Sequence, residues 1–168
     1  MIKIGKNIGK FSTYSYRPTN RNELQEIIKE RIKQYGNNCD LNDIDTSLIT
    51  DMSWLFNWSK FNGDISCWDT SKVTTMRSMF ADSSFDGDIS NWNVSNVINM
   101  TWLFRNTEFN QDISKWDISN VTDMSEMFER SKFNQDISDW KINNDCDTAH
   151  MFNRCNINDN FKPKTLQK

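Results

Sequence analysis

The chain has 168 residues and a formal net charge of −3, and aromatic residues make up 12% of it. This length is sufficient for one domain with its own core. Without an overall cationic charge or a long apolar run, the chain is expected to bind no nucleic acid and to span no membrane.

Residues 1–36 are predicted to form an N-terminal extension with a capping helix. Asn20 followed by Glu23 resembles a capping box, and Gly36 is a natural helix stop. Apolar residues between them recur at the spacing of one helix face, at Leu24, Ile27, Ile28 and Ile32. We therefore expect a helix over Arg21–Tyr35 that covers the first coil of the repeats. For residues 1–17, pairing with that coil and the absence of a fixed contact both remain open.

Residues 37–161 are dominated by a repeated motif of 24 residues, which appears first as FNGDISCWDTSKVTTMRSMFADSS. The four copies begin at Phe61, Phe85, Phe109 and Phe133, and the last copy is degraded. A fixed period of this size predicts a solenoid, in which each coil buries its apolar residues against its neighbours.

Each copy contains signals for two strands and one helical turn. The runs Asp-Ile-Ser-x-Trp and Val-Thr-x-Met have strand composition. The run Met-x-x-Met-Phe places apolar residues at the spacing of a helix face. The predicted fold is therefore a β-rich solenoid with one short helical turn per coil and an N-terminal helical cap.

Five apolar columns are expected to form the core of this solenoid. Two of them are phenylalanine columns, at Phe56, Phe80, Phe104, Phe128 and Phe152, and at Phe61, Phe85, Phe109 and Phe133. The others are headed by Trp68, Ile65 and Met52 and recur at the same period. Large rings stack into ladders only when successive coils lie about 4.8 Å apart.

The run FNxDISxWDxSxVTxMxxMF resembles the BspA-like repeat of bacterial surface proteins and mycoplasma lipoproteins, a short relative of the leucine-rich repeat. The resemblance covers residues 41–161. It implies a leucine-rich-repeat-like solenoid and a role in adhesion or protein binding. Secreted relatives begin with a signal peptide or a lipoprotein cysteine, and residues 1–10 show neither. The sequence therefore favours the cytoplasm over the cell surface.

One column of carboxylates is the main candidate for metal chemistry, at Asp64, Asp88, Asp112 and Asp136. Stacked carboxylates repel one another unless they are neutralised or hydrogen-bonded. Calcium is one answer, and a structural role in which each Asp accepts backbone N–H groups is the other. The structural role is the main interpretation, because the glycine-rich nonapeptide of calcium-binding repeats is missing.

No constellation of residues predicts an enzyme or a cofactor. The four cysteines form no C-x-x-C pair, and His150 is the single histidine. Zinc at Cys146, His150 and Cys155 is a remote alternative. No nucleophile–base pair or phosphate loop is evident, so we expect no catalysis and no cofactor.

A partner-binding face is expected where side chains vary between copies, because such positions are not needed for stacking. The candidates are Trp54, Trp58, Arg77, Trp102, Arg105, Glu126, Arg130, His150 and Arg154. Tryptophan and arginine are enriched at interface hot spots. An alternative places Trp54 and Trp58 under the N-terminal helix, covering the first coil.

Charge is uneven along the chain. Residues 36–161 carry nine basic and twenty acidic side chains, whereas the tail 162–168 carries three lysines. The acidic body suits a partner protein with a basic surface. No cap is evident after Phe161, so self-association through that end is a second expectation.

The predicted function is non-catalytic protein binding, inside a cell or as a phage or mobile-element accessory. Two alternatives are a building block of a larger assembly and a surface adhesin exported by an unrecognised route.

Overall fold

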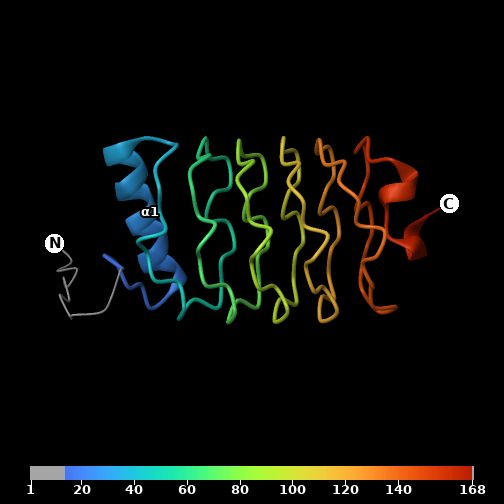
Figure 1. Cartoon of the computed structure of the whole chain (residues 1–168), viewed down its shortest axis with the longest axis horizontal. Helices are drawn as coiled ribbons and strands as arrows, with labels where there is room; N and C mark the ends of the chain where they lie inside the picture. The colour runs from blue at the N-terminus through green and yellow to red at the C-terminus, as the bar shows by residue number, and fades with distance from the viewer. Residues whose placement is uncertain (1–13, 168) are drawn as a thin grey trace.

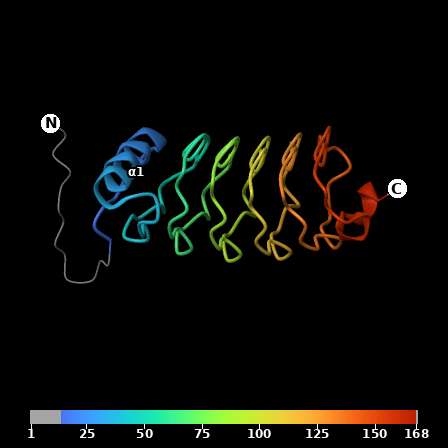
Figure 2. The same ribbon diagram turned by 90° about the horizontal axis from the view of Figure 1, so that it is seen from above.

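The computed structural model describes residues 14–167, which stack as successive coils of chain along one axis (Figure 1). Helix α1 (Arg21–Tyr35) lies at one end of the stack. Two short 3-10 helices, η1 (Asp159–Phe161) and η2 (Lys164–Leu166), lie at the other end. The same order is seen from above (Figure 2). No helix in this described part is long and apolar enough to cross a membrane.

The helix predicted over Arg21–Tyr35 is confirmed, although its start differs in detail. Asn20 Oδ1 accepts the N–H groups of Asn22 and Glu23, as an N-cap does. The Glu23 carboxylate accepts the N–H and hydroxyl of Thr19, and not the Asn20 N–H of a standard capping box. The face with buried Leu24, Ile27 and Ile28 belongs to the same core as the coils. The helix therefore covers the first coil, as expected.

Residues 1–13 lie outside the described residues, so the prediction for residues 1–17 is answered only in part. Tyr16 forms an isolated parallel bridge with Ile44 in the first coil. This part of the extension therefore pairs with that coil.

The prediction of a β-rich, leucine-rich-repeat-like solenoid with a helical turn in each coil is wrong. Between residues 14 and 167 there is no strand and no sheet, and α1 is the only α-helix. β-Type pairing between coils is limited, in this range, to six isolated parallel bridges, such as Thr75 with Asn99. The coils are made of turns and irregular chain.

The helical turn is missing because two residues of each repeat have a left-handed backbone. Met-x-x-Met-Phe lies in a turn segment, for example residues 101–106, where Trp102 has φ 60° and Asn106 has φ 52°. An α-helix requires negative φ throughout, so these two positions interrupt it. Every second N–H in the segment instead reaches the next coil, as in Trp102 N–H to Ser125 O at 3.1 Å.

The first predicted strand of each copy is replaced by a tight turn, and the second is reduced to one bridge residue, such as Asp123, which follows another tight turn. The Trp116 N–H donates to the Ile113 carbonyl at 3.1 Å, and the Val121 N–H donates to the Ile118 carbonyl at 3.0 Å. The equivalent bonds recur in the other complete copies. Since a turn reverses the chain between its ends, Ile113 and Trp116 both face the core.

The predicted aromatic columns are confirmed as the core. Phe80 stacks on Phe104 with ring centroids 5.7 Å apart, and Phe85 stacks on Phe109 at 6.4 Å. The tryptophans headed by Trp68 are also buried. Each donates its indole N–H to a carbonyl of the preceding coil, at 3.0 to 3.3 Å: Trp68 to Leu41, Trp92 to Ile65, Trp116 to Ile89 and Trp140 to Ile113.

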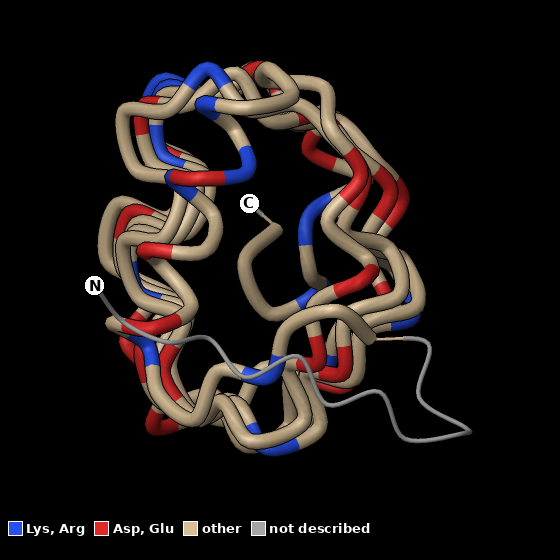
Figure 3. The backbone as a smooth tube through the Cα atoms, turned by 90° about the vertical axis from the view of Figure 1, so that its left-hand side faces the viewer, with Lys and Arg blue, Asp and Glu red and all other residues tan. Residues whose placement is uncertain are grey.

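The expectation of an uncapped C-terminal end is wrong for the described residues. The Ile137 N–H donates to the Phe161 carbonyl, and Lys164 Nζ lies 2.8 Å from the Asp139 carboxylate. Pro163 is buried and Leu166 packs against the core. Viewed along the stack, the C-terminal segment lies inside the outline of the coils (Figure 3). The basic tail therefore covers the last coil.

Candidate partner-binding ridge

The turn segments of successive coils lie side by side, joined by backbone hydrogen bonds, and we call them the turn ridge. It comprises residues 53–58, 77–82, 101–106, 125–130 and 149–154. All nine predicted face residues belong to it. The structure therefore brings together residues that the sequence distributes over a hundred positions.

The variable columns of the ridge coincide with its left-handed positions. Ten non-glycine residues have positive φ, between 52° and 65°. They are Trp54, Ser78, Trp102, Glu126 and His150, and four residues further on Trp58, Asp82, Asn106, Arg130 and Arg154. Ordinary side chains in this region strain the backbone. Four of the five ridge segments keep a Trp, Glu, His or Arg at these positions, although glycine would relieve the strain.

Trp54 and Trp102 meet across the coil that separates them. Their ring centroids lie 6.4 Å apart in an edge-to-face arrangement. Two coil spacings of about 4.8 Å each would place the rings further apart, so the two side chains lean toward each other. The residue in the same column between them is Ser78, which is 0% exposed. The alternative, in which Trp54 and Trp58 pack under α1, is wrong for Trp58, because this side chain is 75% exposed.

Arginines flank this tryptophan pair. The guanidinium carbon of Arg77 lies 5.0 Å from the Trp102 ring centroid, and that of Arg105 lies 5.8 Å away. These are cation–π distances. Trp102 is therefore fixed by an aromatic ring and two cations.

Arg105 is also the centre of a charged network. Its guanidinium lies 3.0 Å from Glu129, 3.5 Å from Glu126 and 3.6 Å from Asp82. The hydrogen bond to Glu129 is the main reason that the pKa of Arg105 lies above its ordinary value. Burial opposes ionisation of Glu129, but hydrogen bonds with Glu126, Arg105 and Asn153 prevail and lower its pKa. This network holds the middle of the ridge in one arrangement.

The remaining predicted residues are accessible. Trp58, Arg130, His150 and Arg154 are all exposed. Arg130 approaches Glu129 at 3.8 Å, whereas Arg77 and Arg154 form no ion pair with any residue in the range 14–167. The ridge therefore presents arginine side chains without a close ion pair beside tryptophan rings.

A family profile described as "Mycoplasma protein of unknown function, DUF285" matches residues 23–108 and 82–164. The two matches together span residues 23–164, which include most of α1, all the coils and η1. The chain belongs to this family. DUF285 is a repeat family related to the BspA-like repeat proteins, so the resemblance is confirmed at that level only.

Two other comparisons give no relative for this DUF285 chain: no curated protein and no solved structure matches it. The ridge is therefore interpreted from its own geometry.

The carboxylate column lies outside the ridge and has the structural role. Each Asp accepts the N–H of the serine two residues on at 2.9 Å, as Asp112 does from Ser114. This bond lowers the pKa of all four carboxyls. Acidic positions recur at matching places of successive coils (Figure 3). No three His, Cys, Asp or Glu side chains of residues 14–167 are grouped so that they could hold a metal ion.

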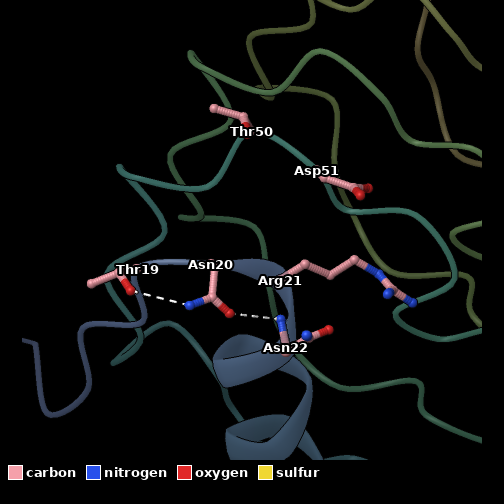
Figure 4. Close-up of a pocket in the computed structure, with 6 residues that line it drawn as sticks. All are labelled: Thr19, Asn20, Arg21, Asn22, Thr50 and Asp51. Atoms are coloured by element: carbon pink, nitrogen blue, oxygen red, sulfur yellow. Dashed lines mark hydrogen bonds between the residues drawn. The ribbon is translucent and has the colours of Figure 1, made fainter.

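Neither the cysteines nor a hollow beside α1 has the features of a functional site. The four thiols are unpaired, and burial raises the pKa of Cys146 to about 11, so this thiol is not activated. A hollow of about 350 Å³ lies beside the start of α1, lined by Thr19, Asn20, Arg21, Asn22, Thr50 and Asp51 (Figure 4). The Asn20 side chain is committed to capping α1, and Arg21 reaches away to the Ser53 carbonyl. These groups do not converge on a ligand.

Several ridge residues carry no signal in the sequence that marks them as part of a binding surface. They are Ser78, Asp82, Asn106 and Glu129. Ser78 was overlooked because a small polar residue carries no hot-spot signal. Its position between two tryptophans of one column was the available clue.

Proposed function

We propose that this chain is a non-catalytic protein-binding module and that the turn ridge is its binding surface. The observation that carries the proposal is the concentration of two residue types on one surface. All three tryptophans outside the buried column lie on the ridge, at Trp54, Trp58 and Trp102. All four arginines of residues 36–161 lie there too, at Arg77, Arg105, Arg130 and Arg154.

This concentration is not needed for folding. The left-handed positions would be relieved by glycine, and Trp58 buries little of its surface. Tryptophan and arginine are the residues that most often dominate binding energy at protein interfaces. The Arg105 network supports the proposal further, because a pre-ordered surface loses less entropy on binding.

The test is capture of a partner by the immobilised chain, followed by titration calorimetry with the purified partner. Trp102→Ala and Arg130→Glu are expected to weaken binding by about tenfold or more, which is the range of interface hot spots. Ile98→Ala and Lys115→Glu are matched controls, because both residues are exposed and lie off the ridge. Equal affinities for all four variants would contradict the proposal. Arg130→Glu is the cleaner variant, since Arg130 is exposed and its loss leaves the core intact.

A further inference from the structure

The centre of the ridge contains a buried hydroxyl group, Ser78 Oγ, which has no hydrogen-bond partner among residues 14–167. The Ser78 N–H donates to the Thr101 carbonyl of the next coil at 2.9 Å, so the backbone here is fixed. A buried unpaired hydroxyl is unfavourable by about 1–3 kcal/mol, so its presence needs an explanation.

Ser78 is fully buried although it stands in the variable column of the ridge, between Trp54 and Trp102. It shares its column and its left-handed backbone with Trp54 and Trp102, with φ 53° against 65° and 60°. Its side chain therefore leaves the coil in the same outward direction as theirs. The two rings meet over it at 6.4 Å. Rotation of the exposed Trp54 side chain would open Ser78 to a partner without disturbing the stack.

The charge around Ser78 selects the chemistry of that partner. Arg77 is adjacent in sequence and lies against Trp102, and its charge also acts on the Asp123 carboxylate without a close ion pair between the two. The ridge carries four arginines against three carboxylates, whereas the rest of residues 36–161 carries five lysines against seventeen carboxylates. The ridge is thus the basic strip of an otherwise acidic body, and it attracts an acidic group that the body repels.

We propose that the ridge binds an extended, acidic segment of a partner protein. One Asp or Glu carboxylate of that segment is held by the Arg77 guanidinium and the Ser78 hydroxyl, between Trp54 and Trp102. Charge-assisted hydrogen bonds of this kind are among the strongest in interfaces, and the tryptophan rings cover the apolar side chains next to the carboxylate. This inference rests on the proposed function, and it names an acidic partner for this surface where the charge of the whole body favoured a basic one.

The first experiment selects ligands from a random dodecapeptide library displayed on phage, against the full chain. A parallel selection against Arg77→Gln is the matched control, because this variant keeps a polar side chain and loses the charge. The expected result is enrichment of Asp and Glu in the wild-type selection and its loss in the control. Enrichment of Lys and Arg, or no enrichment that depends on Arg77, would overturn the inference.

The second experiment measures affinities of one selected peptide by calorimetry. Replacing its acidic residue by the matching amide, or Ser78 by Ala, is expected to weaken binding about tenfold. Ser78→Ala removes an unpaired hydroxyl and should leave the urea midpoint of unfolding unchanged, which separates binding from folding. In ¹⁵N spectra, the indole N–H signals of Trp54 and Trp102 should shift on binding, while those of the buried tryptophans stay. Equal affinity for the acidic peptide and its amide variant would contradict the inference.

The two proposals fail separately. If a captured partner depends on Trp102 and Arg130 but not on Arg77 and Ser78, the ridge is the binding surface and its partner is not acidic. If ridge variants change nothing, the ridge itself is the wrong surface.

Discussion

At the scale of single residues, the tryptophans fall into two groups that differ in what their indole N–H contacts. The column headed by Trp68 is buried, and each N–H in it donates to a carbonyl 27 residues earlier. Trp58 is 75% exposed and lies on the ridge. The repeat pattern separates the two groups, because the first occurs in every copy and the second varies. The carbonyl partner is set by the stacking of the coils.

The buried bond can be tested by a substitution that keeps the ring. Trp116→Phe removes the N–H that binds the Ile89 carbonyl at 3.2 Å and leaves that carbonyl buried without it. We expect a loss of about 1–3 kcal/mol in the free energy of unfolding, measured by urea denaturation. Trp58→Phe is the control, with an expected change within about 0.5 kcal/mol. Equal effects of the two substitutions would show that the indole bond is not what matters.

The carboxylate column makes the stability of the protein depend on pH. Serine N–H bonds lower the pKa of Asp64, Asp88, Asp112 and Asp136 in the folded chain, whereas unfolded Asp titrates near pH 4. This contribution is therefore fully present above about pH 4, and it is lost as pH falls through the lower folded pKa values. Replacing all four by Asn keeps an oxygen acceptor without a titrating group.

The expected outcome is that the urea midpoint of the wild type falls relative to that of the Asn variant as the solution is acidified below about pH 4. A constant difference from pH 7 downward would contradict a folded pKa shift in this column. The measurement is a urea denaturation series at several pH values on both proteins.

At the scale of elements, α1 was predictable because its signals are local. A cap at Asn20, a stop at Gly36 and an apolar face lie within one short segment. The prediction of a helical turn in each repeat was wrong for the opposite reason. Met-x-x-Met-Phe has helical spacing, but each segment has two left-handed positions, and glycine, the usual signal for positive φ, occupies neither of them in any copy. Inter-coil hydrogen bonds at every second N–H stabilise this backbone, and one copy cannot form them alone.

This backbone strain gives a prediction at Arg154, which has φ 56° and is exposed. A β-branched side chain is worst in the left-handed region, and glycine is the most tolerant residue there. Arg154→Val should therefore be less stable than Arg154→Gly by about 1–2 kcal/mol in urea denaturation. As a control, the same pair at Lys115, an exposed residue without positive φ, should show no such preference for glycine. If the Arg154→Val variant were as stable as the Arg154→Gly variant, the backbone at this position would not be strained.

At the scale of the whole molecule, both ends of the stack are covered. Helix α1 shields the first coil, and the segment with η1 and η2 shields the last (Figure 1). An open end would present apolar side chains, as repeat proteins do when their terminal caps are removed. The tail covers Phe152 from one side, with Lys162 Nζ 5.8 Å from its ring centroid.

Removal of residues 162–168 should therefore cause self-association. We expect the full chain to stay monomeric at concentrations where the version ending at Phe161 forms dimers or larger species, since Pro163 and Leu166 no longer cover the last coil. Light scattering coupled to size exclusion measures this difference. Lys164→Ala in the full chain is the control, because it removes only the exposed ion pair to Asp139. An associated full chain and a monomeric truncation would reverse the role assigned to the tail.

The sequence by itself determined the period, the aromatic columns, the helix Arg21–Tyr35 and the residues that vary on one surface. Each of these depends on residue type at a fixed spacing, which the chain displays directly. Only the tertiary structure decided the backbone of the coils, the cover of the C-terminal end and the meeting of Trp54 with Trp102 over Ser78. These features depend on contacts between coils, where the bonding partner lies about one full repeat away. Local propensity carries no information about such a partner. For this reason the sequence predicts strands at places where the structure has turns and irregular chain.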